Sequence, residues 1–100
     1  MNESLTFLSE LEAIIQQRLD SPSPDSYTAT LARGGAMRVA QKVGEEGVEL
    51  ALAALAGTPE QQLDEAADLI FHVLVLLRTK GLGLSDVAER LRARHAAHGR

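Results

Sequence analysis

Residues 42–77 read KVGEEGVELALAALAGTPEQQLDEAADLIFHVLVLL, and this stretch decides the fold. Leu and Ala dominate it, and these residues favour helices, whereas β-branched and aromatic residues favour strands. Near its middle, Gly57 is placed to serve as the C′ residue of one helix. Thr58 as N-cap, Pro59 at the first helical position and Gln61 at N3 then form a capping box that starts the next helix. The stretch therefore predicts two long helices joined by a tight turn.

The rest of the chain is also typical of helices, so we expect an all-α protein. Helices are predicted over about residues 4–19, 36–56 and 58–80, with a short helical turn over 26–33. The segment Leu84-Ser85-Asp86 is predicted to open a last helix, with Ser85 as N-cap and Val87, Ala88 and Leu91 on its buried face. The prolines in Ser21–Pro24 end the first helix, because proline cannot continue one. Residues 1–100 are expected to form a single domain, since a chain of this length has no room for a second core.

The composition argues against several classes of protein. A net charge of −4 disfavours nucleic-acid binding, which needs a basic surface. The absence of cysteine excludes disulfides and a thiolate metal site. The most apolar run, Leu69–Leu77, is interrupted by His72 and is far shorter than the ~20 residues that a membrane span requires. Because the first residues lack the basic and apolar regions of a signal peptide, a cytoplasmic protein is expected.

Each of the two long helices carries one narrow polar stripe on an otherwise apolar cylinder. The members of each stripe fall within about 60° of one another on the helical wheel. A short connection packs the helices as an antiparallel hairpin, in which residues at the same level have numbers that add to a constant. With Gly57 as the pivot, the stripes are predicted to meet level by level: Lys42 with His72, Glu46 with Asp68, and Glu49 with Glu65.

The four carboxylates of these stripes, on Glu46, Glu49, Glu65 and Asp68, predict a metal site. Acids that share an apolar cleft either take up protons or are neutralised by a cation. Hard oxygen ligands without thiolate favour Mg²⁺, with Mn²⁺ as an alternative. Such an ion keeps positions open for substrate phosphates and makes its bound water more nucleophilic. Lys42, one turn from Glu46, is then expected to act as a point charge on phosphate.

Several roles stay open when the residues alone are considered. Either acidic motif by itself is usually a solvated helix face. The two motifs together are stronger evidence for a metal site, because both lie on apolar helices at matched levels. Glu45 lies about 60° further round the helix and is a base, a fifth ligand or a surface residue. His72 is either a donor that faces phosphate or a hydrogen-bonded core histidine.

The apolar surface of the second long helix predicts a dimer. Leu69–Phe71 and Val73–Leu77 cover this helix with apolar side chains nearly all round, and a helix that is apolar on every side must be buried on every side. A chain of 100 residues can hardly surround so long a central helix. We therefore expect a homodimer with a four-helix core built from two helix pairs.

The spacing Glu46-x-x-Glu49, fifteen residues and then Glu65-x-x-Asp68 resembles the all-α nucleoside-triphosphate pyrophosphohydrolase superfamily, the MazG-like group. Within this superfamily, the sequence is most similar to the family of phosphoribosyl-ATP pyrophosphatases. The matching segments cover nearly the whole chain and are Ser26–Thr28, Gly34-Gly35, Gln41–Glu46 with Val48-Glu49, Glu65–Leu69 with His72–Leu77, Gly81-Leu82 and Arg94-His95. Gly47 departs from the pattern, because relatives usually carry Ala there, and this should affect local helix stability more than chemistry.

The resemblance implies a homodimeric helical enzyme that uses Mg²⁺ to hydrolyse the α–β phosphoanhydride of phosphoribosyl-ATP. The products would be phosphoribosyl-AMP and pyrophosphate, in the second step of histidine biosynthesis. By this likeness the metal ligands are Glu46, Glu49, Glu65 and Asp68, and the catalytic set is Glu45, Glu46 and Glu49. The substrate contacts implied are Lys42, Ser26, Tyr27, Thr28, Gly34, Gly35 and His72.

Two other functions are alternatives. A house-cleaning enzyme of the same superfamily, which hydrolyses dCTP, dUTP or damaged nucleotides, would share the metal site and differ in the substrate loop. Ser26–Thr28 and Gly34-Gly35 are therefore the features that discriminate between the two enzymes. A non-catalytic helical dimerisation module would carry the acidic stripes as solvated faces and would not be stabilised by Mg²⁺.

Overall fold

Two long helices form an antiparallel hairpin, as the sequence predicts. The computed structural model describes residues 2–99. In this range it contains the helices α1 (Glu3–Asp20), α2 (Tyr27–Arg33), α3 (Gly35–Ala56), α4 (Pro59–Thr79) and α5 (Leu84–His98), and no strand. The predicted all-α class is therefore confirmed. Across the same residues, every helix is too short or too polar to cross a membrane.

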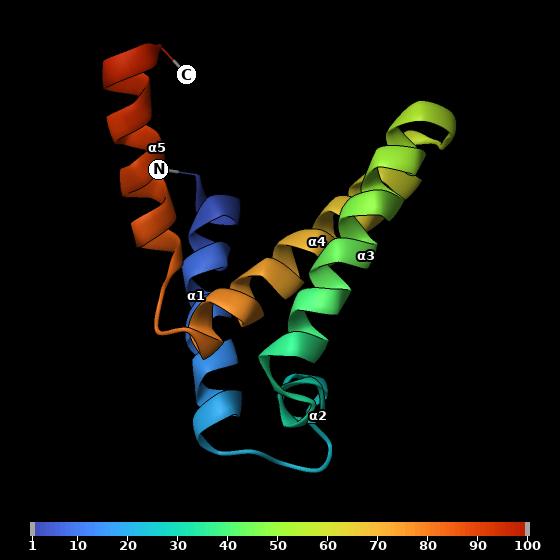
Figure 1. The fold of residues 1–100 in the computed structure, drawn as a ribbon, viewed down its shortest axis with the longest axis vertical. Helices are drawn as coiled ribbons and strands as arrows, with labels where there is room; N and C mark the ends of the chain where they lie inside the picture. The colour runs from blue at the N-terminus through green and yellow to red at the C-terminus, as the bar shows by residue number, and fades with distance from the viewer. Residues whose placement is uncertain (1, 100) are drawn as a thin grey trace.

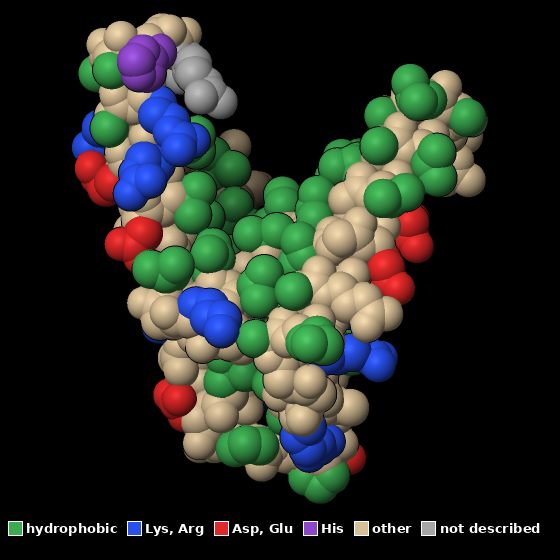
Figure 2. Space-filling model, in the orientation of Figure 1, with side chains coloured by type: hydrophobic (Ala, Val, Ile, Leu, Met, Phe, Trp, Pro, Cys, Tyr) green, Lys and Arg blue, Asp and Glu red, His purple; other side chains and the backbone are tan. Residues whose placement is uncertain are grey.

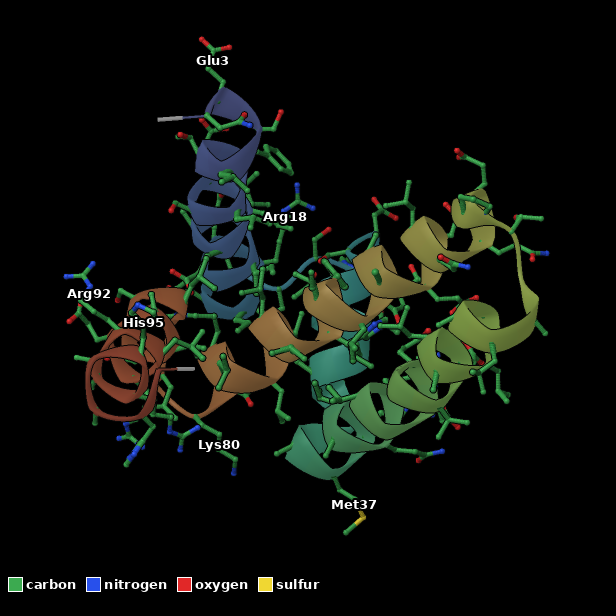
Figure 3. The ribbon with its side chains drawn as sticks, turned by 90° about the horizontal axis from the view of Figure 1, so that it is seen from above. Glu3, Arg18, Met37, Lys80, Arg92 and His95 are labelled. Carbon is green, nitrogen blue, oxygen red and sulfur yellow. The ribbon has the colours of Figure 1, made fainter. Side chains whose placement is uncertain are left out.

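The helices form two arms that converge at one end of the molecule, where α2 lies (Figure 1). We call this end the foot. One arm is the antiparallel pair of α3 and α4, which are joined by Gly57 and Thr58. The other arm contains α1 and α5, and the short α2 lies at the foot beside α3. Seen from above, α3 and α4 lie side by side, while α5 stands apart from them (Figure 3). The C-terminal half of α4 packs on α1, so α4 connects the two arms.

Side-chain caps fix the starts of two helices. Thr58 Oγ1 accepts a hydrogen bond from the Gln61 N–H at 3.2 Å, and Gln61 Oε1 accepts one from the Thr58 N–H at 2.9 Å. With Pro59 at the first position of α4, the predicted capping box is confirmed. Ser26 Oγ caps α2 by accepting the Ala29 N–H at 3.1 Å. These caps satisfy N–H groups that have no partner inside the first turn.

Gly57 ends α3 in a different way from a typical C′ glycine. Its φ of −96° and ψ of 176° are extended, not left-handed. A Cβ atom at this position would lie 2.9 Å from the carbonyl oxygen of Ala53, closer than real Cβ atoms come to backbone. Glycine is therefore needed at position 57 because the chain passes close to the end of α3, and not because φ is positive.

The prediction that Ser85 caps the last helix is wrong by two residues. α5 begins at Leu84, and its N-cap is Gly83. The Asp86 carboxylate accepts the Gly83 N–H at 2.8 Å, and the Glu12 carboxylate of α1 accepts the Leu84 N–H at 2.6 Å. Because these two acids satisfy the first backbone donors, the helix starts before the serine is reached.

The predicted buried face of α5 is exposed in the single chain. None of the described residues of α5 is fully buried. Val87 and Leu91 are 38% and 55% exposed, and Ala88 is exposed as well. The prediction is therefore wrong for the isolated chain, because α5 turns away from α4 after the connection at residues 80–83 (Figure 1).

The core lies at the foot, where α1, α2, α3 and α4 meet. Its side chains, all at most 4% exposed, are those of Ile15, Leu31, Val39, Leu74 and Val75. Towards the tip of the α3–α4 hairpin, no residue between positions 47 and 71 is fully buried. The single chain therefore holds the hairpin at one end, and the acidic stripes lie between that end and the exposed tip.

Candidate metal centre

Carboxylates from both long helices meet along the hairpin. Glu46 and Glu49 lie about one turn apart on α3, and Glu65 comes from α4. One carboxylate oxygen from each residue lies within 4.8 Å of the other two. This convergence agrees with the level pairing expected for Glu49 and Glu65, and it adds Glu46 to the same group. We call these three residues the acidic triad.

Two oxygens of the acidic triad lack a hydrogen-bond partner. Glu46 is 5% exposed, and its Oε2 is buried without a partner, as is Oε2 of Glu65. Leaving a buried polar atom unsatisfied is unfavourable by about 1–3 kcal/mol, and carboxylates so close together repel one another. A bound cation would remove both penalties. The donors are all carboxylate oxygens, so the acidic triad fits a hard divalent cation.

Asp68 lies at the edge of the acidic triad and not inside it. The residue is exposed, and its carboxylate is not among the oxygens that converge. Its backbone carbonyl oxygen instead lies 2.7 Å from His72 Nδ1. The structure thus brings together three of the four predicted metal ligands, and the role of Asp68 as the fourth stays a prediction.

Lys42 lies on the same stripe of α3 and contacts the acidic triad. Its Nζ is 3.4 Å from Glu46 Oε1 and 3.8 Å from Glu45 Oε1. The hydrogen bond to Glu46 raises the pKa of Lys42 above its ordinary value, and the nearby Tyr27 and Glu45 add to the rise. Lys42 is therefore a cation at the edge of the site. It engages Oε1 of Glu46 and leaves Oε2 for another ligand.

Glu45 faces outward beside the acidic triad. Its side chain is 49% exposed, and its Oε2 accepts a hydrogen bond from Gln41 Nε2 at 3.3 Å. Its carboxylate does not belong to the converging group. This position suits a base or a surface residue better than a fifth metal ligand.

The predicted substrate contacts on α2 differ strongly in exposure. Ser26 and Thr28 are 3% and 6% exposed, and Ser26 Oγ is engaged as the helix cap. Tyr27, between them, is 52% exposed, and its hydroxyl lies 2.8 Å from His72 Nε2 on α4. Gly34-Gly35 forms the junction of α2 and α3, where the second glycine has a φ of +80° that other residues rarely adopt. Tyr27 is therefore the member of Ser26–Thr28 that is both solvent-accessible and linked to α4.

Helical periodicity does not predict the contact between Tyr27 and His72. The two residues are 45 positions apart in the chain. Helical periodicity predicts which residues share one face of a single helix. It does not predict which separate helices are in contact. The signal available from the sequence was only that both residues fall in segments that match the same family.

Fold and geometry together define a class, an all-α protein with a carboxylate-lined centre suited to a divalent cation. Comparison with known proteins narrows this class. Residues 8–95 match the model of the phosphoribosyl-ATP pyrophosphohydrolase family, so the chain belongs to that family. The resemblance drawn from the sequence is therefore confirmed.

Related proteins extend beyond the region that they share with this chain. The chain is 50% identical over 92 residues to the histidine biosynthesis bifunctional protein HisIE of Photobacterium profundum, which covers 92% of this chain and 44% of that protein. It is 48% identical over 91 residues to HisIE of Vibrio cholerae, which covers 91% of this chain and 43% of that protein. It is also 48% identical over 96 residues to HisIE of Campylobacter jejuni, which covers 96% of this chain and 46% of that protein. The chain thus spans less than half the length of these relatives.

Proposed function

We propose that this chain hydrolyses the α–β phosphoanhydride of phosphoribosyl-ATP to phosphoribosyl-AMP and pyrophosphate, in the second step of histidine biosynthesis. The observation that carries the proposal is the acidic triad with its two unpartnered oxygens, found in a chain of the phosphoribosyl-ATP pyrophosphohydrolase family. Under this proposal, residues 1–100 form one pyrophosphohydrolase domain.

The proposal assigns the cation as Mg²⁺, with Mn²⁺ as the alternative, because both prefer oxygen ligands. The residues that would hold it are Glu46, Glu49, Glu65 and Asp68, with Asp68 contributing from the edge. When bound, such a cation neutralises phosphate charge and makes a water molecule more nucleophilic.

Residues around the acidic triad are assigned to phosphate binding, proton transfer and contact with the nucleotide. Lys42, which the contact with Glu46 holds in place, binds a phosphate oxygen as a point charge. Glu45, whose side chain is 49% exposed and which lies outside the acidic triad, takes the proton from the attacking water. The nucleotide is assigned to the side of the site formed by the Gly34-Gly35 junction and by the start of α2, where Tyr27 is exposed and Ser26 and Thr28 are buried.

The direct test measures pyrophosphate release from phosphoribosyl-ATP with and without Mg²⁺, with dCTP and dUTP in parallel. We expect Mg²⁺-dependent release from phosphoribosyl-ATP alone, because the family and the acidic triad both favour it. Release only from the deoxynucleotides would keep the metal chemistry and exclude the histidine pathway. No release from any of the three, together with no Mg²⁺ binding, would favour a non-catalytic helical module.

Exposed apolar side chains support the proposal of a homodimer. A groove of ≈ 370 Å³ between α1 and α4 is lined by Phe7, Leu8, Leu11, Leu63, Ala66, Ala67, Ile70 and Phe71. Hydrophobic side chains gather between the two arms (Figure 2), and Leu52 and Leu55 on α3 are 61% and 86% exposed. Contiguous apolar surface of this kind marks an interface. A second copy that covers α3 and α4 would complete the predicted four-helix core.

The variant Ile70→Asp is expected to convert the dimer into a monomer, because the dimer would then bury an unpaired charge. Sedimentation velocity of the wild-type and variant chains measures the change. Ile14→Asp is a matched control, since Ile14 is 40% exposed against 45% for Ile70 and does not line the groove. A wild-type chain that sediments as a monomer would contradict the proposal.

We also propose that the protein is cytoplasmic and that its partner is a small nucleotide. Under this proposal it binds neither nucleic acid nor a membrane. The absence of cysteine fits a reducing compartment. The net charge of −4 disfavours a long polyanionic partner. Both inferences agree with an enzyme of small-molecule metabolism.

A further inference from the structure

A chain of hydrogen bonds links α2 to α4 beside the acidic triad. The Tyr27 hydroxyl lies 2.8 Å from His72 Nε2, and His72 Nδ1 lies 2.7 Å from the Asp68 carbonyl oxygen. The histidine is 5% exposed, and its ring meets those of Tyr27 and Phe71 edge to face, with centroids 5.8 and 5.3 Å apart. Both ring nitrogens are thus engaged inside the protein. His72 therefore has no nitrogen left for a phosphate group.

The chemistry of the three groups sets where the protons lie when the imidazole is neutral. A carbonyl oxygen only accepts hydrogen bonds, so His72 Nδ1 must carry a proton towards Asp68. In the neutral imidazole, Nε2 is then an acceptor, and the Tyr27 hydroxyl must donate its single proton to it. The Tyr27 oxygen therefore has only lone pairs to offer to any further partner. It can accept a hydrogen bond from a ligand and cannot donate one to a phosphate oxygen.

Tyr27 offers these lone pairs at the edge of the acidic triad. The residue is 52% exposed, so a ligand can reach it. Its hydroxyl lies 2.8 Å from His72 Nε2, and His72 Nδ1 contacts the carbonyl oxygen of Asp68, which is one turn from Glu65 on α4. Lys42, together with a cation held by the acidic triad under the proposed function, would supply the positive charges that phosphate groups need. The group next to the phosphates in a nucleotide is a ribose, and its hydroxyls are hydrogen-bond donors.

We infer that His72 is a positioning residue, which holds Tyr27 as a hydrogen-bond acceptor for a hydroxyl of the ribose attached to the triphosphate. The inference rests on the proposed function, because it places a nucleotide at the acidic triad. It replaces the expectation that His72 contacts substrate directly, and it gives Tyr27 the task of recognising a sugar and not a phosphate. His72 acts through Tyr27, because the imidazole itself is buried.

The proton positions are tested without any substrate, by ¹⁵N–¹H spectra of the full chain with labelled histidine at pH 8. The chain has 3 histidines, so the spectrum of His72→Leu assigns the signal of His72. We expect the tautomer with Nδ1 protonated and Nε2 bare, and Tyr27→Phe should shift the Nε2 resonance. A ring protonated at Nε2, or at both nitrogens, would overturn the inference. This outcome is independent of whether the chain hydrolyses phosphoribosyl-ATP.

The ribose contact is tested by the binding of α,β-methylene-ATP and its 2′,3′-dideoxy form in Mg²⁺. Tyr27→Phe should weaken binding of the first about three- to tenfold, the effect of one lost hydrogen bond, and leave binding of the second unchanged. His72→Leu should match Tyr27→Phe, and the double variant should be no weaker than either, because the residues act as one unit. His72→Gln should recover part of the loss, since its amide oxygen can accept the Tyr27 proton.

Thr30→Val is the matched control, because it removes another α2 hydroxyl that bonds Arg33 at 2.9 Å. It should bind both nucleotides as the wild type does. Equal weakening of both nucleotides by Tyr27→Phe would overturn the ribose contact, as would a wild-type chain that binds neither. If the proton positions hold and pyrophosphate release from phosphoribosyl-ATP is absent, the proposed reaction has failed and the positioning role of His72 stands.

Discussion

Replacing Glu49 by Gln is expected to lower pyrophosphate release from phosphoribosyl-ATP by at least about a hundredfold, while the chain stays folded. Glu49 is exposed and supplies one of the three oxygens of the acidic triad. An amide keeps the size of the side chain but lacks the charge that holds a hard divalent cation. The measurement is kcat/KM in Mg²⁺, with far-ultraviolet circular dichroism to show that the helices remain.

The matched control for Glu49→Gln is Glu10→Gln on the exposed surface of α1, which should retain full activity. Asp68→Asn extends the test to the ligand that lies outside the acidic triad, and it should also abolish turnover. Full activity in Glu49→Gln would remove this residue from the metal site. Full activity in Asp68→Asn alone would leave the three residues of the acidic triad as the protein ligands.

Replacing Glu46 by Leu is expected to stabilise the metal-free chain and to abolish its stabilisation by Mg²⁺. Glu46 is 5% exposed and has one carboxylate oxygen without a partner, so an apolar side chain should stabilise the metal-free fold by about 1–3 kcal/mol. In the wild type, Mg²⁺ at a hundredfold excess over Kd should add about 2.7 kcal/mol by mass action. Thermal unfolding with and without Mg²⁺ measures both effects.

Lys42 loses an ion-pair partner in Glu46→Leu, but its side chain is 28% exposed and can be hydrated. Lys42→Met controls for this loss, and it should retain the response of the unfolding temperature to Mg²⁺. The assignment of Glu46 would be wrong if the variant were less stable than the wild type without Mg²⁺ and still responded to the ion.

Local rules in the sequence predicted the part of the fold that carries the site. The capping box at Thr58 and Gln61 depends on residues within one turn, and such signals are readable without any tertiary contact. The approach of Glu49 to Glu65 followed from a fixed helical rise and a short turn. A prediction of this kind succeeds where geometry is set by adjacent residues of the chain.

The features that the sequence did not predict depend on contacts between separate helices. Glu12 of α1 helps to start α5 before Ser85, and no pattern around residue 85 contains that contact. The hydroxyl of Tyr27 meets His72 only because α2 packs at the foot of the hairpin. Asp68 is exposed and lies outside the acidic triad, and helical periodicity alone does not resolve which side chains of a stripe converge.

The lack of fully buried residues between positions 47 and 71 bears on how tightly the single chain can bind a metal ion. A segment with so little burial is expected to open locally at low free energy, and we expect the opening to start at the Gly57 end, which the core does not hold. Glu49 and Glu65 lie on opposite sides of that opening, so only the closed population presents all three oxygens. The apparent affinity for the ion is the intrinsic affinity multiplied by the closed fraction. Any contact that closes the hairpin, such as a second subunit, therefore raises metal affinity without touching the metal.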